Sequence, residues 1–156
     1  MKSIIILILF ILICQSVGII GATFTMSSLD NWYRTIQKPS WNPPDWIFGP
    51  VWTTLYAIMG FSMWTIWKNR ATQKISWCII IFIIQLLLNG IWTPLFFGLK
   101  NPALALIDIM FLFSAIIATI IIFYKVNRLA SLILIPYLLW VGFATILNYH
   151  LWKLNC

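Results

Sequence analysis

The chain has 156 residues, of which 62% are hydrophobic and only 8% are charged, and its formal net charge is +7. A water-soluble domain of this size carries charge on about a quarter of its residues, so the composition excludes an ordinary soluble domain. The ten basic residues are scattered over predicted loops and ends instead of forming one cluster. Such scattering is typical of cations that flank membrane spans, and it argues against a nucleic-acid-binding surface.

Five apolar stretches are each long enough to cross a bilayer as a helix. In chain order they are residues 3–24, 46–67, 75–97, 102–124 and 129–152. The links after the second, third and fourth stretches are only a few residues long, so neighbouring helices must be antiparallel. The sequence therefore predicts an all-α integral membrane protein, a five-helix bundle that forms one domain over residues 1–156 and lies in a lipid bilayer.

The first stretch also has features of a secretory signal, because Lys2 precedes an apolar run. The run is longer than a usual signal core, however, and no A-x-A cleavage pattern follows it. Gly18 and Ala22 form a pair of small residues, spaced for close contact with another helix. We therefore expect a retained membrane helix.

The segment 32–52 holds four of the ten tryptophans and four of the seven prolines. Flexible linkers use glycine, serine and charged residues instead, and prolines reduce the freedom of the unfolded chain. We expect this segment to fold as a lid over an apolar site. Arg34 and Lys38 lie in it, where they could pair with carboxylates at the edge of a ligand.

Two predicted spans carry polar and aromatic residues at helical spacing. The third has Gln85, Asn89, Trp92 and Phe96, and the fifth has Tyr137, Trp140, Ala144 and Asn148. Pro136 is predicted to bend the fifth helix near its start. Such stripes occur in packed cores and also in pockets, and Asn89 fits either a ligand contact or a bond between helices. Indole faces around a bundle cavity suit a flat, conjugated ligand such as a porphyrin, whereas a sterol would match only the apolar part.

Asp108 is the single acidic residue inside a predicted span. A carboxylate in a membrane is costly and is therefore a functional candidate. The structural alternative is an interhelical hydrogen bond to Asn89 or a threonine. A proton-coupled multidrug exchanger would need such a membrane carboxylate, but the chain contains no glutamate, so we disfavour that class.

The remaining ionisable residues and cysteines bear on metals and orientation. Cys14, Cys78 and Cys156 are far apart in sequence and His150 is the single histidine, so we predict no metal site, no disulfide framework and no cofactor. One set of helix ends carries Lys2, Lys68, Arg70, Lys74, Lys125 and Arg128, and the other carries Arg34, Lys38, Lys100 and Lys153. This asymmetry predicts a cytoplasmic N-terminus.

Four ordered blocks of sequence resemble the TspO/MBR family, the tryptophan-rich sensory proteins, whose mitochondrial members are the translocator protein or peripheral benzodiazepine receptor. The blocks are WYRTIQKPSWNPP with the following VWTTLY, QLLLNGIWTPLFFG, ALALIDI, and LIPYLLWVGFATILNYHLW. The resemblance covers nearly the whole chain. The chain departs from common relatives at Gly90 and Thr93, where many carry tryptophan and proline.

The resemblance implies a five-helix membrane bundle, often a homodimer, that binds porphyrins, sterols or benzodiazepine-type drugs and acts as a sensor, regulator or translocator. The positions that match the family's pocket are Tyr33, Trp41, Pro43, Trp52, Asn89, Trp92, Trp140, Ala144 and Leu147.

An enzymatic alternative also comes from the resemblance, because some bacterial members are proposed to degrade porphyrin with light and oxygen. Trp52 and Trp140 match the tryptophans linked to that chemistry, although no general acid–base pair or nucleophile is visible in the sequence. Leu147, Tyr149 and Lys153 additionally fit a short pattern proposed for cholesterol contact.

Overall fold

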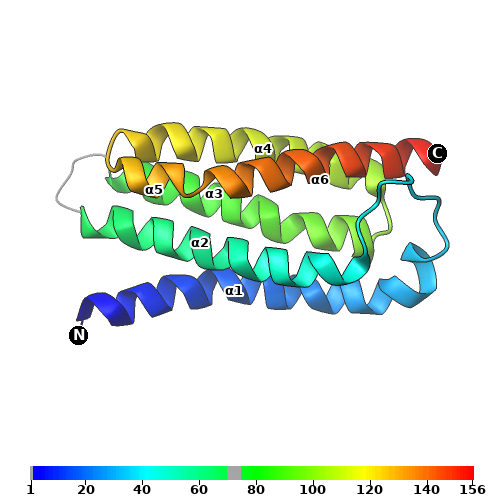
Figure 1. The fold of residues 1–156 in the computed structure, drawn as a ribbon, viewed down its shortest axis with the longest axis horizontal. Coiled ribbons are helices and arrows are strands. Elements are labelled where there is room, and N and C mark those ends of the chain that lie inside the picture. Colours follow the sequence, from blue (N-terminus) through cyan, green and yellow to red (C-terminus); the bar gives the residue numbers. More distant parts are fainter. Residues whose placement is uncertain (1, 70–74) are drawn as a thin grey trace.

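The computed structural model describes residues 2–69 and 75–156, and all regular structure within them is helical (Figure 1). The elements are α1 (Lys2–Ser28) with the π-helical turn η1 (Leu29–Tyr33), the 3-10 turn η2 (Asp45–Ile47) leading into α2 (Phe48–Lys68), α3 (Ile75–Thr93) with the π-helical turn η3 (Pro94–Gly98), α4 (Pro102–Tyr124), α5 (Arg128–Leu132) and α6 (Ile135–Leu154).

The long helices lie side by side in one elongated bundle (Figure 1). The start of α1 and the ends of α2 and α4 lie at one end, which we call the N-terminal end. The connection between α1 and α2, the α3–α4 connection and the C-terminus lie at the other, which we call the loop end. Along the bundle, α1 packs on α2 and α3, while α4 packs on α3 and α6.

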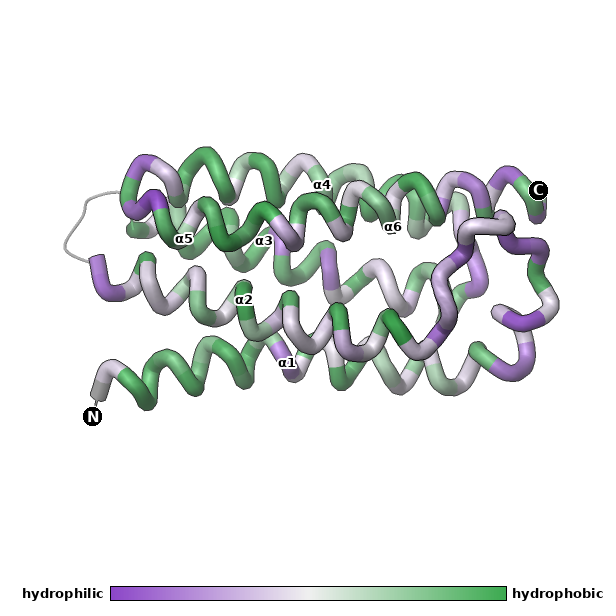
Figure 2. The backbone as a smooth tube through the Cα atoms, in the orientation of Figure 1, coloured by the Kyte–Doolittle hydropathy of each residue, from purple (hydrophilic) through white to green (hydrophobic). Residues whose placement is uncertain are grey.

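The helices have the length and surface of membrane spans. In the described part of the chain, four segments are long and apolar enough to cross a bilayer, namely Ser3–Tyr33, Ile75–Gly98, Pro102–Tyr124 and Arg128–Leu154. With 21 residues α2 has a similar length, but its threonines, serine and glycines make it less apolar. Most hydrophilic residues gather at the two ends of the bundle (Figure 2). The chain is therefore a multi-pass integral membrane helical bundle, as predicted.

The basic residues divide between the two ends in the predicted way. Lys68, Lys125 and Arg128 follow or precede helices at the N-terminal end, whereas Arg34, Lys38, Lys100 and Lys153 lie at the loop end. Arg70 and Lys74 lie outside the described residues. The side of the membrane that each end faces stays a prediction.

The predicted span at 102–124 coincides with α4, whereas the first span is longer than predicted. The helix continues past residue 24 to Ser28 and then through η1 to Tyr33. The polar residues there do not end it because their hydroxyls bond to the preceding turn: Thr25 Oγ1 donates to the carbonyl of Gly21 at 3.3 Å and Ser27 Oγ to that of Phe24 at 2.8 Å.

The last predicted span is interrupted. A break at residues 133–134 separates α5 from α6, and Pro136 occupies the first turn of α6, where its missing N–H costs nothing. The interruption predicted near Pro136 is therefore a two-residue turn, at Ile133 and Leu134, between α5 and α6. Ser62 Oγ donates to the carbonyl of Ala130 at 2.7 Å and Ser131 Oγ to that of Ile120 at 2.8 Å, which holds α5 against α2 and α4.

Proline also shapes the loop end of α3. Pro94 cannot donate to the helical ladder, and the chain continues as η3, in which the N–H of Leu99 bonds to the carbonyl of Pro94 at 2.8 Å. Asn101 then caps α4, because its side chain accepts from the N–H of Leu104 at 3.0 Å, and Pro102 follows at the first helical position.

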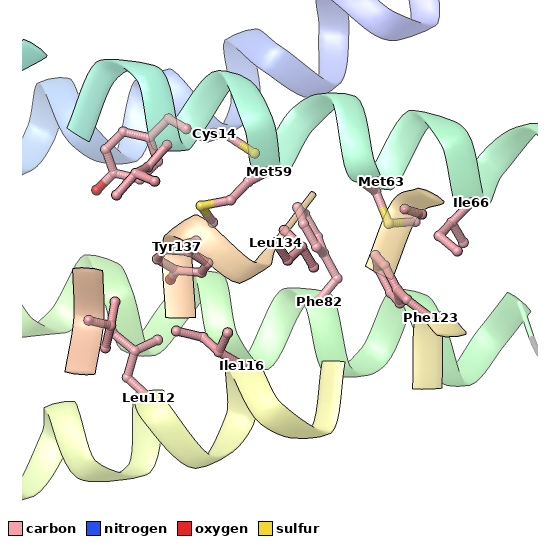
Figure 3. Packing of buried hydrophobic residues seen from close by; sticks show 14 of the residues in the cluster. Cys14, Met59, Met63, Ile66, Phe82, Leu112, Ile116, Phe123, Leu134 and Tyr137 are labelled. Atoms are coloured by element: carbon pink, nitrogen blue, oxygen red, sulfur yellow. The ribbon is translucent and has the colours of Figure 1, made fainter. Parts of the chain in front are cut away.

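The N-terminal end of the bundle is solidly packed. Met59, Met63, Phe82, Phe123 and Leu134 are all buried in one cluster, where their side chains interlock between α2, α3, α4 and the last helices (Figure 3).

Small residues set the distance between α1 and its neighbours. A Cβ added to Gly60 would lie 2.7 Å from the Cα of Ile11, so α1 and α2 meet there backbone to backbone. The predicted pair is half confirmed: Gly18 packs against the ring of Tyr56, but Ala22 is exposed.

Candidate ligand-binding cavity

A cavity of about 430 Å³ lies in the loop-end half of the bundle, between α1, α2, α3, α4 and α6. This volume falls in the range of small-molecule binding sites. Aromatic side chains make up much of its wall, namely Tyr33, Phe48, Trp52, Tyr56, Trp92, Phe96, Phe97 and Trp140.

The rings of the wall hold one another in place. Trp92 and Phe96 are stacked, with centroids 5.0 Å apart and planes 18° apart. The rings of Phe48 and Trp140 meet edge to face with centroids 5.9 Å apart, and the ring centroids of Trp52 and Tyr56 are 5.6 Å apart. Ring pairs at these distances attract one another beyond their area burial, so the cavity has stiff, flat walls.

A chain of hydrogen bonds closes the inner end of the cavity. Tyr56 Oη donates to Asn89 Oδ1 at 2.6 Å, Asn89 Nδ2 donates to Tyr137 Oη at 3.0 Å, and Tyr137 Oη donates to Gln85 Oε1 at 3.0 Å. All four side chains are buried and they join α2, α3 and α6. Asn89 thus bonds helices together and lines the cavity, and its second N–H hydrogen is left for a ligand.

The two tryptophans on facing helices differ in their hydrogen bonds. Trp92 Nε1 donates to Asn148 Oδ1 at 3.0 Å, and Asn148 Nδ2 donates in turn to the carbonyl of Pro102 at 2.8 Å. Trp140 Nε1 is buried and has no partner in the described part of the chain. An unpaired buried donor is unfavourable. Trp140 thus has an unused N–H, which an acceptor on a ligand can reach if the indole ring shifts.

Of the segment 32–52 predicted as a lid, residues 34–44 form the connection between η1 and η2, which we call the lid from here on; it is tied to the C-terminal end of α6. Asn155 exchanges two hydrogen bonds of 2.9 Å with the backbone of Gln37. The ring of Trp41 lies 5.9 Å from Phe143 and 5.2 Å from His150, edge to face in both pairs.

Arg34 and Lys38, the two cations near the lid, differ in how close they lie to the cavity wall. Arg34 pairs with Asp30 at 3.1 Å, and both side chains are largely exposed. The ammonium of Lys38 lies 4.1 Å from the centroid of the Tyr33 ring, and Tyr33 is part of the cavity wall. Asp45 itself lines the cavity. Lys38 is therefore the better-placed of the two cations expected to meet a ligand.

The structure brings most of the predicted pocket residues together. Those that line the cavity are Tyr33, Trp52, Asn89, Trp92, Trp140, Ala144 and Leu147. Trp41 and Pro43 lie in the lid and do not line it. Of the proposed cholesterol pattern, Leu147 faces the cavity, whereas Tyr149 is 41% exposed and Lys153 is exposed as well, so the three residues do not share one face.

Sequence reasoning missed part of the wall. Tyr56 lies one helical turn after Trp52, and this spacing places both on one face of α2. The contribution of α1, through Gln15 and the residues up to Met26, had no comparable signal because α1 is apolar on all sides.

Asp108 lies beside the cavity without lining it. Its neighbours Ile109 and Leu112 contribute to the wall, and Asp108 itself is buried with its Oδ2 unpartnered in the described structure. The expected bond to Asn89 is wrong, because the side chain of Asn89 bonds to Tyr56 and Tyr137 instead.

The chain is similar to known proteins over nearly its whole length. The model of the TspO/MBR family matches residues 10–153. The chain belongs to the TspO/MBR family. It is 42% identical to the tryptophan-rich protein TspO of Chlorobaculum tepidum, over 99% of this chain and 98% of that protein. It is 41% identical to the human translocator protein, over 87% and 82% of the two chains. For the tryptophan-rich protein TspO of Archaeoglobus fulgidus the identity is 42%, over 96% of each chain.

The region that matches the TspO/MBR family contains every residue that lines the cavity, from Gln15 to Leu151. Gly90 and Thr93, the two positions at which the resemblance implies a departure from common relatives, both face α1. A Cβ on Gly90 would lie 3.1 Å from the side chain of Val17, and Thr93 lies against Gly21. This family member therefore differs where α1 meets α3.

Proposed function

We propose that this protein binds porphyrins of the protoporphyrin type, and similar apolar ligands such as sterols or benzodiazepine-type drugs, and acts through them as a sensor, regulator or translocator. The observation that carries the proposal is the cavity of about 430 Å³, walled by aromatic rings and placed within a membrane bundle.

The chemistry of a porphyrin matches the distribution of groups around the cavity. Its macrocycle is flat and conjugated, and it can stack on the faces of Trp52, Trp92 and Phe96. The free N–H groups of Trp140 and Asn89 can bond to its polar edge. Its carboxylates would point toward the loop end, where Lys38 provides a positive charge.

Fluorescence titration tests the proposal. We expect protoporphyrin to quench the tryptophan fluorescence of the purified protein in lipid nanodiscs, with saturation at micromolar concentration. Ala144→Phe places a ring inside the cavity and should abolish this saturable phase. Ser114→Phe adds the same ring on the exposed, lipid-facing side of α4 and should leave it intact. Quenching that never saturates, or that is equal in both variants, would contradict the proposal.

Sterols and benzodiazepine-type drugs should compete for the same space. If they occupy the cavity, they will release bound protoporphyrin and restore fluorescence in the wild-type protein. The homodimer implied by the family resemblance stays a prediction, and the molar mass of the purified protein would test it.

The enzymatic alternative is oxidative porphyrin degradation in light. It is favoured by one observation, which is that Trp52 and Trp140 both line the cavity. An enzyme should convert bound protoporphyrin to a discrete product with consumption of oxygen, and both Trp52→Phe and Trp140→Phe should lose this activity. Bleaching at the rate of the free ligand would leave a binding protein.

A further inference from the structure

Helix α1 contacts α2 along its N-terminal part, as far as Gly18, which packs against the ring of Tyr56. Gly60 and Ile11 meet backbone to backbone, and Gln15 Nε2 donates to the carbonyl of Thr53 at 2.8 Å. These contacts close the wall of the bundle between the two helices from the N-terminal end up to about the middle of α1.

Beyond that point α1 changes its partner. Gly21 packs against Thr93, because a Cβ added at position 21 would lie only 3.2 Å from Thr93 Oγ1. Further along, Ser28 Oγ donates to the carbonyl of Phe97 at 2.7 Å. The loop-end half of α1 therefore follows α3 and η3.

The first turns of α2 lean the other way. The ring centroids of Phe48 and Trp140 are 5.9 Å apart, and those of Trp52 and Tyr137 are 6.4 Å apart. Trp140 and Tyr137 both belong to α6. The loop-end half of α1 thus contacts α3 and η3, whereas the first turns of α2 contact α6 through these rings. The distance between α1 and α2 therefore increases along the side of the cavity.

Several residues at this parting belong to the cavity wall and to the outer surface at once. Ile19 is 67% exposed and Met26 is 74% exposed, and Ala22, Gly49 and Thr53 are exposed as well, yet all five line the cavity. A Cβ added to Gly49 would meet nothing within 4 Å. Residues that line the cavity and are also exposed on the outer surface are expected at the rim of an opening, and the free space beside Gly49 agrees with an opening between α1 and α2.

The depth of this opening decides what lies outside it. The exposed ion pair of Asp30 and Arg34 marks where α1 reaches water. Met26 and Ile19 precede Asp30 by one and about three helical turns, which places them about 6 Å and about 16 Å deeper along the helix. The polar layer on each side of a bilayer is about 5–8 Å thick, so Met26 lies near its inner edge and Ile19 lies in the hydrocarbon layer. By contrast, the lid over the water-facing end is tied down by Asn155 through two hydrogen bonds.

We propose that ligands enter and leave the cavity sideways, from the bilayer, through the opening formed by Ile19, Ala22, Met26, Gly49 and Thr53, which we call the α1–α2 portal. This inference rests on the proposed binding function and narrows its ligand class. The ligands are molecules that first dissolve among the acyl chains and then pass edge-on between two helices, instead of being captured from water through the lid.

Binding kinetics in nanodiscs test the portal. Gly49→Leu and Ala22→Leu each place a branched side chain in it from one of the two helices. Both variants should slow the association and the dissociation of protoporphyrin by about tenfold, since passage then needs a rearrangement. A change confined to the affinity, with the wild-type association rate kept, would contradict the portal. Ser114→Leu, on the lipid-facing side of α4, is the matched control and should keep wild-type rates.

A variant of the lid tests the alternative route, in which ligands enter from water. Asn155→Ala removes both bonds to Gln37 and should leave the two rates unchanged. If Asn155→Ala speeds both rates while the portal variants keep wild-type rates, ligands pass through the lid and the portal is refuted.

A readout without porphyrin separates this inference from the proposed function. Ala144→Cys, combined with Cys156→Ser, places a thiol at the cavity wall, while Cys14 and Cys78 are buried. A lipid-soluble maleimide should label it rapidly, an impermeant maleimide slowly, and Gly49→Leu should suppress the rapid reaction. Equal labelling with and without Gly49→Leu would overturn the portal. If the wild-type protein fails to bind porphyrin, only the proposed function fails, and this labelling still decides the portal.

Discussion

The two halves of the bundle have similar apolar composition but opposite packing. At the N-terminal end, flexible methionines and aliphatic side chains fill the space around Phe82 and Phe123 (Figure 3). At the loop end, Trp52, Trp92 and Trp140 surround a cavity of about 430 Å³. Methionine and leucine adapt their shape to gaps, whereas large rigid rings held by one another cannot. At the loop end a smaller buried cluster that includes Tyr33, Phe96 and Phe97 therefore lies beside a cavity that the side chains do not fill.

The largest effect is expected from a change in the solid half. Gly60→Leu would force α1 away from α2, because the added Cβ would meet backbone atoms of Ile11. We expect the free energy of unfolding to fall by about 3 kcal/mol, measured by denaturation in detergent. Gly49→Ala is the control in the hollow half, where the new Cβ has free space, and it should change stability by less than about 0.5 kcal/mol. Equal losses would remove the contrast between the halves.

The boundary between the halves depends on the hydrogen bonds of Asn89. Asn89→Leu deprives the hydroxyls of Tyr56 and Tyr137 of one partner each, and should lower the free energy of unfolding by about 1–2 kcal/mol. Gln85→Leu removes a single bond from the same chain and should cost about half as much. A stability loss for Gln85→Leu that exceeds the loss for Asn89→Leu would show that the network is organised differently.

Within the hollow half, two tryptophans should respond in opposite ways. Trp140→Phe removes an unpartnered N–H, so protoporphyrin affinity should fall about fivefold, the value of one hydrogen bond, with no loss of stability. Trp92→Phe removes a donor that is already bonded to Asn148, and should lower stability by about 1 kcal/mol with a smaller effect on affinity. Fluorescence titration and thermal unfolding of both variants distinguish the two roles, and matching profiles would refute them.

The smallest effects concern charge at the rim of the hollow half. Lys38→Gln should weaken protoporphyrin binding two- to threefold and Asp45→Asn should strengthen it by a similar factor, since exposed charges contribute about 1 kcal/mol or less. The dimethyl ester of the same porphyrin carries no carboxylates and should bind all variants alike. Added salt should reduce the differences. Identical responses of acid and ester would show that these charges do not meet the ligand.

Much of this architecture is readable from local pattern. The apolar runs place the long helices, and Asn101 followed by Pro102 marks the start of α4 to the residue. The spacing of Gln85, Asn89 and Trp92 assigns one face of α3 to the interior, because neighbours three and four apart share a face. The missed extension of α1 to Tyr33 has a local cause, since hydroxyl bonds to the preceding turn hide the polar character of its last residues.

The sequence by itself determined the membrane environment, the helical bundle, the interior faces of α3 and α6, and the family. Only the tertiary structure decided that Tyr56 bonds Asn89, that Asp108 does not, that Trp41 sits on the lid side, and that α1 leaves α2 beside the cavity. Periodicity states which residues share a face of one helix. It does not state how far that helix is rotated or tilted against the next, and those two quantities decide which faces meet and where the wall stays open.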